Sequence, residues 1–217
     1  MFKLLKKLYA ISIVLIMAIM TMFACNKAQK GNLIEPLYTA QDMNNLQDGI
    51  YRVTLNANDI KEENSKTYFT PDVYSEDLYD TVEIHNLKVG DRVFNRGKEE
   101  LVESIHWDKS ESRLCINFPS FDEAEEVYIP SESGGTYYIE LPDGHHSYSL
   151  RGKAKILVDD KLILKDSSQW GEPEKSIALK DIKSHIAKGY ENDFNVLSTY
   201  LRVENGKVVE FVHHYIP

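Results

Sequence analysis

The stretch "RVENGKVV", residues 202–209, gives the clearest structural signal in this chain. Asn205 and Gly206 form a pair that is favoured in a two-residue type I′ turn, because both central positions of that turn need a positive φ. Alternating apolar and polar residues on both sides are typical of β-strands. The turn sets which residues of the two strands face one another: Glu204 and Lys207, Val203 and Val208, Tyr200 and Phe211. The sequence therefore predicts an antiparallel hairpin here.

Similar alternation, broken by turn residues, continues back to residue 49 and predicts a mainly β fold. Two more hairpins are predicted, one over residues 137–151 with its turn at 142–144 and one over residues 153–165 with its turn at 159–160. Shorter strands are predicted at residues 50–55, 81–87, 92–94, 101–107, 113–118 and 126–129. A helix is predicted over residues 177–188. Short strands and hairpins with one or two short helices predict an antiparallel barrel or sandwich.

The register of the carboxyl-terminal hairpin predicts a candidate binding surface. Residues on one face of a strand alternate, and one face of this hairpin carries aromatic residues with a single cation: Tyr200, Arg202, Phe211, His213 and Tyr215. If the opposite, aliphatic face packs on the core, the aromatic face is exposed, and its composition is favoured at interfaces. If the hairpin lies inside a sandwich, both faces are buried and no such surface exists.

A second, weaker candidate is the stretch "TYFTPDVYSEDLYD", residues 67–80. It mixes tyrosines with carboxylates, and its candidate binding residues are Tyr68, Tyr74, Glu76 and Tyr79. Aromatic rings can pack on the apolar faces of sugars, and carboxylates accept hydrogen bonds from hydroxyl groups. The composition therefore suits a glycan site. The alternative is a surface loop that is anchored by its aromatic residues in the core.

The sequence contains no catalytic motif that we can name. Gly90 and Gly97 are separated by six residues, whereas a phosphate-binding P-loop has four. His213 and His214 are adjacent in a predicted strand, so they point to opposite faces and cannot share a metal ion without a β-bulge. Among 34 acidic residues, sequence alone cannot single out a catalytic carboxylate pair. We therefore predict no metal, no cofactor and no catalytic residue, although a carboxylate-dependent enzyme stays an alternative.

The amino-terminal segment has the layout of an export signal. Three lysines, Lys3, Lys6 and Lys7, precede the uncharged residues 8–24. The segment then ends in Met22-Phe23-Ala24-Cys25, which resembles the lipobox of bacterial lipoproteins. The resemblance implies that the Cys25 thiol is lipidated, that the chain is cut before it, and that the acyl chains hold the protein on the outer face of a bacterial membrane. The alternative is an uncleaved membrane anchor, which would need about 20 apolar residues.

These observations predict the organisation of the chain: a signal peptide at 1–24, a flexible tether at 25–36, and one β-rich domain at 37–217 that has room for a small subdomain. Removal of residues 1–24 takes away three lysines and no acid, so the net charge falls from −9 to −12. A protein with this negative net charge repels the phosphate backbone, which disfavours nucleic acid as a partner. Once Cys25 is lipidated, Cys115 is the only thiol left, so no intrachain disulfide is expected.

The function expected from the sequence is that of a membrane-tethered extracytoplasmic module that binds an envelope protein or a glycan without catalysis. The membrane contact is made through the lipid anchor. Two alternatives stay open. One is a hydrolase that uses carboxylates to act on the cell wall or a polysaccharide, and the other is a structural envelope lipoprotein with no small ligand.

Overall fold

The computed structural model describes residues 31–37, 42–167, 173–189 and 194–214. In these ranges the chain is mostly β-structure with two short α-helices, so the predicted mainly β fold of short strands is confirmed. Residues 1–30, which carry the predicted signal peptide and Cys25, lie outside the described ranges. No helix in the described part of the chain is both long and apolar enough to cross a bilayer.

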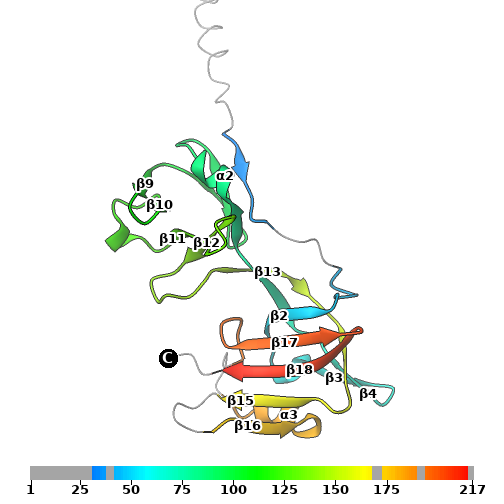
Figure 1. Cartoon of the computed structure of the whole chain (residues 1–217). Helices are drawn as coiled ribbons and strands as arrows, with labels where there is room; N and C mark the ends of the chain where they lie inside the picture. The colour runs from blue at the N-terminus through cyan, green and yellow to red at the C-terminus, as the bar shows by residue number, and fades with distance from the viewer. Residues whose placement is uncertain (1–30, 38–41, 168–172, 190–193, 215–217) are drawn as a thin grey trace, which may run out of the picture.

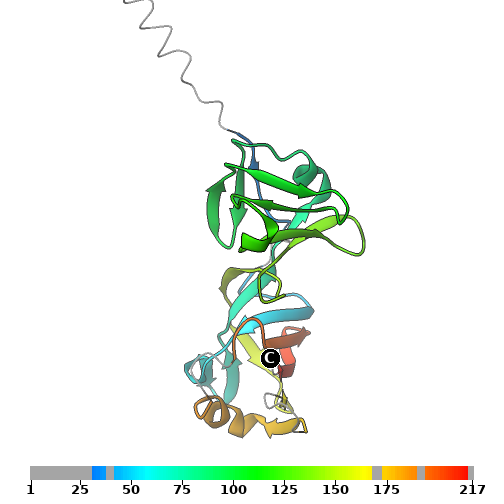
Figure 2. The ribbon, with the colours of Figure 1, turned by 90° about the vertical axis from the view of Figure 1, so that its left-hand side faces the viewer.

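The strands form two lobes, each around its own hydrophobic core (Figures 1 and 2). The inserted lobe consists of residues 77–146 together with β1. The main lobe consists of strands that precede and follow residues 77–146 in the sequence, so the first lobe is inserted into it. The inserted lobe contains β1 (Leu33–Ile34), β6 (Leu78–Asp80), α2 (Thr81–His85), β7 (Arg92–Asn95), β8 (Lys98–Leu101), β9 (Ile105–Asp108), β10 (Arg113–Ile116), η2 (Phe121–Glu123), β11 (Val127–Pro130) and β12 (Thr136–Glu140). Its sheets have the orders β1-β7-β8 and β6-β12-β11-β10-β9.

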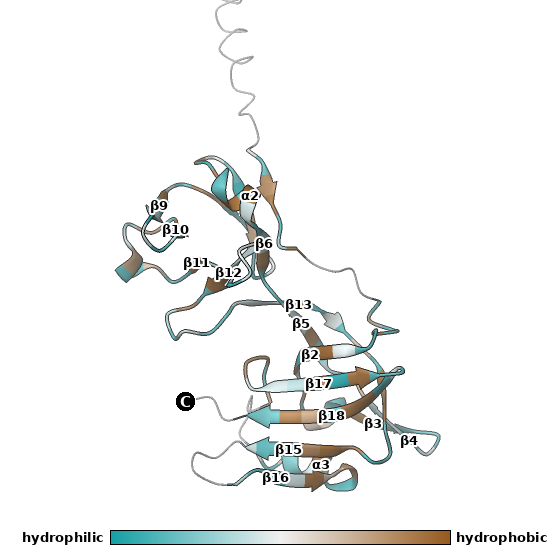
Figure 3. Ribbon diagram, in the orientation of Figure 1, coloured by the Kyte–Doolittle hydropathy of each residue, from teal (hydrophilic) through white to brown (hydrophobic). Residues whose placement is uncertain are grey.

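The main lobe is one large curled sheet with the order β13-β5-β2-β17-β18-β14-β4-β3, and β15 joins it beside β18. Its elements are β2 (Gly49–Thr54), η1 (Ala57–Asp59), β3 (Ile60–Glu63), β4 (Lys66–Phe69), β5 (Asp72–Glu76), β13 (Tyr148–Lys153), β14 (Ile156–Val158), β15 (Ile163–Ser167), β16 (Lys175–Ala178), α3 (Leu179–Ile186), β17 (Thr199–Glu204) and β18 (Lys207–His214). The apolar parts of β15, β17 and β18 lie close together in this sheet (Figure 3).

The chain passes between the lobes from β1 to β2, and two further crossings, from β5 to β6 and from β12 to β13, lie together. Asp77, between β5 and β6, is fully buried, and its carboxylate accepts a hydrogen bond of 2.7 Å from the Ser147 hydroxyl. The backbone of the same two residues is bonded as well, since Asp77 N–H donates to Ser147 O at 3.0 Å. This contact holds the two crossings together. That residues 37–217 fold as a single domain stays a prediction.

The carboxyl-terminal hairpin forms as predicted at its turn, where Asn205 and Gly206 have φ values of 51° and 71°. Glu204 faces Lys207 and Val203 faces Val208, also as predicted. Beyond them the register shifts, because β18 has an extra residue between Val208 and Glu210, so Leu201 rather than Tyr200 faces Phe211. The predicted pairing of Tyr200 with Phe211 is therefore wrong. Without this β-bulge the Glu210 carboxylate would share the core face with Val208.

Two other predicted hairpins do not form. β12 and β13 are connected by the expected turn, but only one bridge joins its ends, Glu140 to His146, and β13 pairs with β5 instead. β14 and β15 both pair with β18 in the parallel direction, so the turn at 159–160 does not reverse the chain. The backbone N–H of Asp159 donates to Val208 O at 3.0 Å and continues the pairing through that turn.

One predicted strand is a helix, and the predicted helix is confirmed. Residues 81–85 form α2 because the Asp80 carboxylate caps it, accepting hydrogen bonds from the backbone N–H groups of Val82 and Glu83 at 2.7 and 3.2 Å. α3 lies within the predicted range of 177–188, and its side chains Ile182 and Ile186 are buried in the main core. Cys115 is a free thiol buried in the inserted lobe, and burial raises its pKa.

Candidate ligand-binding surface

The predicted surface of the carboxyl-terminal hairpin is divided between two faces of the sheet. Tyr200 and Arg202 lie half-buried on the outer face of β17. Phe211 and His213 are 0% and 4% exposed and lie on the inner face of β18, in or beside the main core. Their assignment to the outer face is wrong because the β-bulge reverses which residues of β18 face the core. Tyr215 lies outside the described residues.

The weaker candidate stretch is also divided. Tyr74 and Glu76 lie half-buried on β5, whereas Tyr79 is fully buried in the core of the inserted lobe and its hydroxyl donates to Phe94 O at 3.0 Å. Tyr79 is therefore not a surface residue, because β6 belongs to the other sheet. Tyr68 lies half-buried on β4, with the ammonium nitrogen of Lys155 4.7 Å from its ring centroid.

The strand order brings parts of both predicted candidates onto one surface. β2 lies between β5 and β17, so Tyr200 faces Arg52 and Arg52 faces Tyr74. On the next strand, Leu150 faces Tyr74. Directly paired residues project from the same side of a sheet. We call this surface the tyrosine face and define it by six residues: Ile50, Arg52, Tyr74, Tyr148, Leu150 and Tyr200.

The tyrosine face exposes two apolar side chains. Leu150 ends the row on β13, and Ile50 lies two residues before Arg52 on β2; they are 56% and 67% exposed, whereas Ser149 and Tyr51 beside them in sequence are buried. The tyrosine side chains and Arg52 are half-buried. Aromatic residues and arginine are enriched at the centres of binding surfaces.

Arg52 is the cation at the centre of this face. Its guanidinium carbon lies 6.0 Å from the ring centroid of Tyr148 and 5.9 Å from that of Tyr200, within the range of cation–π attraction. Its Nη1 donates to the backbone oxygen of Leu197 at 3.0 Å. No ion pair joins Arg52 to a carboxylate among the described residues, whereas Arg202 pairs with both Glu204 and Glu210.

The electrostatics of the face favour binding over acid–base chemistry. Burial raises the pKa of Tyr148, with a smaller contribution from the Glu76 charge, and the nearby Arg52 partly offsets that rise. The Tyr148 phenol is therefore neutral and can donate a hydrogen bond at neutral pH. At the border of the face, Glu76 Oε1 lies 2.5 Å from His146 Nδ1, and the His146 ring stacks on Tyr138 of β12 with centroids 4.2 Å apart.

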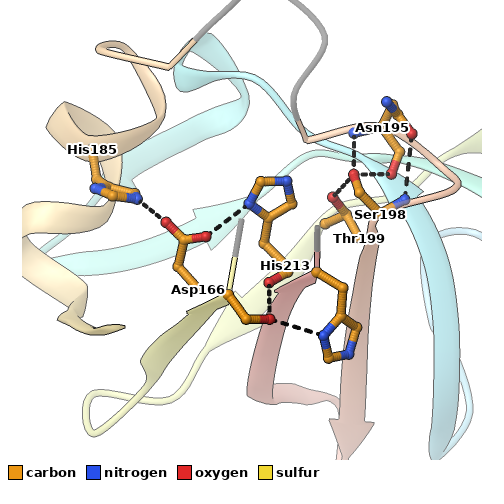
Figure 4. A network of polar contacts seen from close by, with 8 residues as sticks. Asp166, His185, Asn195, Ser198, Thr199 and His213 are labelled. Carbon is orange, nitrogen blue, oxygen red and sulfur yellow. Dashed lines mark hydrogen bonds and ion pairs between the residues drawn. The ribbon is translucent and has the colours of Figure 1, made fainter. Parts of the chain in front are cut away.

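A second polar cluster lies on the inner side of the main sheet (Figure 4). The Asp166 carboxylate binds His213 Nδ1 at 3.0 Å and His185 Nε2 at 2.6 Å, and it is 4% exposed. The ring of Phe194 stacks on His213 with centroids 4.0 Å apart. Beside them Ser198 and Thr199 share a hydrogen bond of 3.2 Å, and Ser198 also contacts Asn195. The cluster connects α3, β15 and β18, and we assign it a structural role.

A pocket of about 300 Å³ lies in the inserted lobe and is lined by His85, Trp107, Lys109 and Ser112. The imidazole of His85 stacks on Trp107 with centroids 5.5 Å apart, and its Nε2 contacts the Tyr137 hydroxyl at 3.2 Å. None of these residues belongs to a predicted site. Nowhere in the described ranges do three or more histidine, cysteine, aspartate or glutamate residues form a group that could hold a metal ion.

Sequence reasoning found Tyr74 and Tyr200 but missed Arg52 and Tyr148. The signal for Arg52 was present, since Tyr51, Val53 and Leu55 alternate with Arg52 and Thr54 and thereby place Arg52 on the outer face. The contacts of Asp166 with His213 and His185 had no such signal in the sequence, because the three residues lie on β15, β18 and α3, which are separate in sequence. Comparison with protein-family models, with curated proteins and with solved structures found no match to this chain.

Proposed function

We propose that this chain is an exported, lipid-anchored module that binds a glycan of the cell envelope on its tyrosine face. The anchor rests on the amino-terminal segment and the lipobox-like Cys25. The binding activity rests on one observation, the row of Tyr200, Arg52 and Tyr74 across three adjacent strands. A domain that is tethered to the outer side of a membrane has envelope polysaccharide and envelope proteins within its reach.

Two features of the row favour a glycan. The rings are fixed on neighbouring strands of a sheet, and sites on such elements are held more precisely than sites on loops. Their apolar faces alternate with groups that form hydrogen bonds, namely the Arg52 guanidinium and the Tyr148 hydroxyl. Sugars have both an apolar face and a border of hydroxyl groups, so this alternation matches them. A stable protein–protein interface buries about 800 Å² on each partner, so a protein would be expected to contact residues well beyond this row.

The proposal can be tested with the full chain in detergent micelles, applied to an array of envelope oligosaccharides. We expect binding, and we expect Tyr74→Ala and Tyr200→Ala each to weaken it about tenfold, which corresponds to about 1.4 kcal/mol. A loss of that size is within the range of a single aromatic contact. Melting temperatures of all variants, measured in the same micelles, separate loss of contact from loss of fold.

Tyr68→Ala is the matched control, because Tyr68 is also a half-buried tyrosine beside a cation but lies on β4, outside the tyrosine face. It should bind like the parent. Equal weakening by all three substitutions would contradict the proposal, and so would a chain that binds no oligosaccharide while an envelope protein protects Tyr74 and Tyr200 from chemical modification.

A further inference from the structure

We infer that the glycan carries a carboxylate, as a uronic acid does, and that Arg52 binds this group. The inference rests on the proposed function, because it names the class of ligand for the tyrosine face. It is carried by the lack of a carboxylate at ion-pair distance from Arg52 among the described residues, in contrast to Arg202 and Lys165.

Arg52 differs from most of the other arginines in the described ranges. Those with a carboxylate at ion-pair distance are Arg92, Arg96, Arg113 and Arg202. Lys165 donates to Glu210 at 2.8 Å, and Arg202 donates to the other oxygen of Glu210 at 2.9 Å. Arg52 has no carboxylate at ion-pair distance in the described ranges, although it is half-buried. A partly desolvated cation without a counter-ion is costly unless a ligand supplies one.

The geometry prepares Arg52 to receive a planar anion. One N–H of Nη1 is used by the backbone oxygen of Leu197, and a guanidinium has five N–H donors in a fixed fork that matches a carboxylate. The rings of Tyr148 and Tyr200 lie within 6.0 Å of the guanidinium carbon. They limit its movement and lower the local dielectric, so an ion pair formed there is stronger than one in water.

Lys155 and Tyr68 form a comparable pair of a cation and an aromatic ring, but here the cation already has a counter-ion. Lys155 lies over the ring of Tyr68 in the same cation–π relationship, but its ammonium donates to the Glu63 carboxylate at 2.6 Å. Its charge is already balanced within the protein. Lys155 is therefore a matched control for Arg52, with an aromatic neighbour but no need for an external anion.

The experiment compares two forms of one ligand on the full chain in detergent micelles. The first is an otherwise neutral oligosaccharide with one uronic acid residue, and the second is the same oligosaccharide with that carboxyl group reduced to a primary alcohol. We expect the acidic form to bind at least tenfold more tightly at low salt. Because exposed charges are screened by salt, this preference should decrease as ionic strength rises.

Three substitutions locate the effect. Arg52→Gln should remove the preference, so that the acidic and reduced forms bind equally, and Arg52→Lys should retain part of it because the charge remains. Lys155→Gln should leave the preference unchanged. Since Arg52→Gln also removes the hydrogen bond to Leu197, melting temperature and affinity for the reduced form show whether that variant is still folded.

The outcomes separate the two proposals. Equal binding of both forms by the parent chain, with loss of binding in Tyr200→Ala, overturns the carboxylate and keeps the glycan site. A preference that survives in Arg52→Gln and disappears in Lys155→Gln also overturns the role of Arg52. If the parent chain binds neither form and also binds no neutral oligosaccharide of the array, the proposed function is overturned together with this inference.

Discussion

Asp166 and His213 form a buried pair in which both residues are 4% exposed and the Asp166 carboxylate lies 3.0 Å from His213 Nδ1. They are direct neighbours on the parallel strands β15 and β18. The second carboxylate oxygen binds His185 of α3 at 2.6 Å. A single acidic side chain therefore connects the helix to the edge of the main sheet.

We expect Asp166→Asn to lower the free energy of unfolding by about 1–3 kcal/mol, the usual cost of leaving a buried hydrogen-bonding group unpaired. The asparagine has nearly the same shape, but it presents an NH2 group to one of two histidine nitrogens. Urea denaturation of the full chain measures the loss. Asp160→Asn is the control, because Asp160 is exposed in the turn before β15. Equal stability of the two variants would show that the cluster does not hold α3 in place.

The turn of the carboxyl-terminal hairpin provides the second prediction. Gly206 has a φ of 71°, and a Cβ built on it meets no atom within 4 Å. Gly206→Val should therefore destabilise through backbone strain alone, by about 1–3 kcal/mol. Gly135 also has open space around it, but its φ is not in the strained region, so Gly135→Val should cost much less. Similar midpoints of thermal unfolding for the two variants would contradict the role of the turn.

Local rules predicted the turn correctly but not the face assignment beyond it. Asn205-Gly206 specifies a positive φ at two positions from the sequence alone. The extra residue of β18 has no comparable local signature, because Val209 differs from Val208 only in its packing. Burying Phe211 instead of Glu210 is what selects the shifted register, and that choice depends on which side of the hairpin meets the core.

The candidate site could be predicted only in parts for a similar reason. Alternation within β2 places Arg52 on an outer face, but nothing in the sequence indicates that β2 lies between β5 and β17. Tyr74 and Tyr200 are 126 positions apart in the numbering, and they join one row only through that strand order. In residues 67–80 the sequence instead suggested one site where the structure has two environments. The chain leaves the main sheet at Asp77, and Tyr79 is buried in the core of the inserted lobe.

The predicted lipid anchor is tested in cells. A bacterium that expresses the full chain should incorporate labelled acyl groups at Cys25 and place the protein in the membrane fraction. Cys25→Ser should abolish both the label and the cleavage before residue 25, because serine lacks the thiol that is acylated. Cys115→Ser is the control, since the Cys115 thiol is buried in the inserted lobe. Retention of residues 1–24 by the parent chain would instead favour an uncleaved membrane anchor.

The final prediction concerns Glu126, whose side chain is only 14% exposed. Burial raises its pKa, the charge of Glu100 raises it further, and contacts with Arg96 and Asn95 offset part of the rise. The folded chain therefore holds this proton more tightly than the unfolded chain does. It follows that the ionised carboxylate lowers stability at pH values above its folded pKa, and that this cost disappears as the pH falls through that pKa towards the unfolded value of about 4.3.

Glu126→Gln should accordingly raise the melting temperature at pH 7, because the amide has the shape of the protonated acid and its oxygen can still accept the hydrogen bond from Asn95. The lost ion pair with Arg96 costs little, since Arg96 is 56% exposed. A gain of about 1 kcal/mol would shift the midpoint by roughly 2–4 °C. The gain should vanish near pH 4, whereas Glu125→Gln, at an exposed neighbour, should show no such trend. A benefit of Glu126→Gln that is the same at pH 4 and pH 7 would contradict the assignment of the cost to the buried charge.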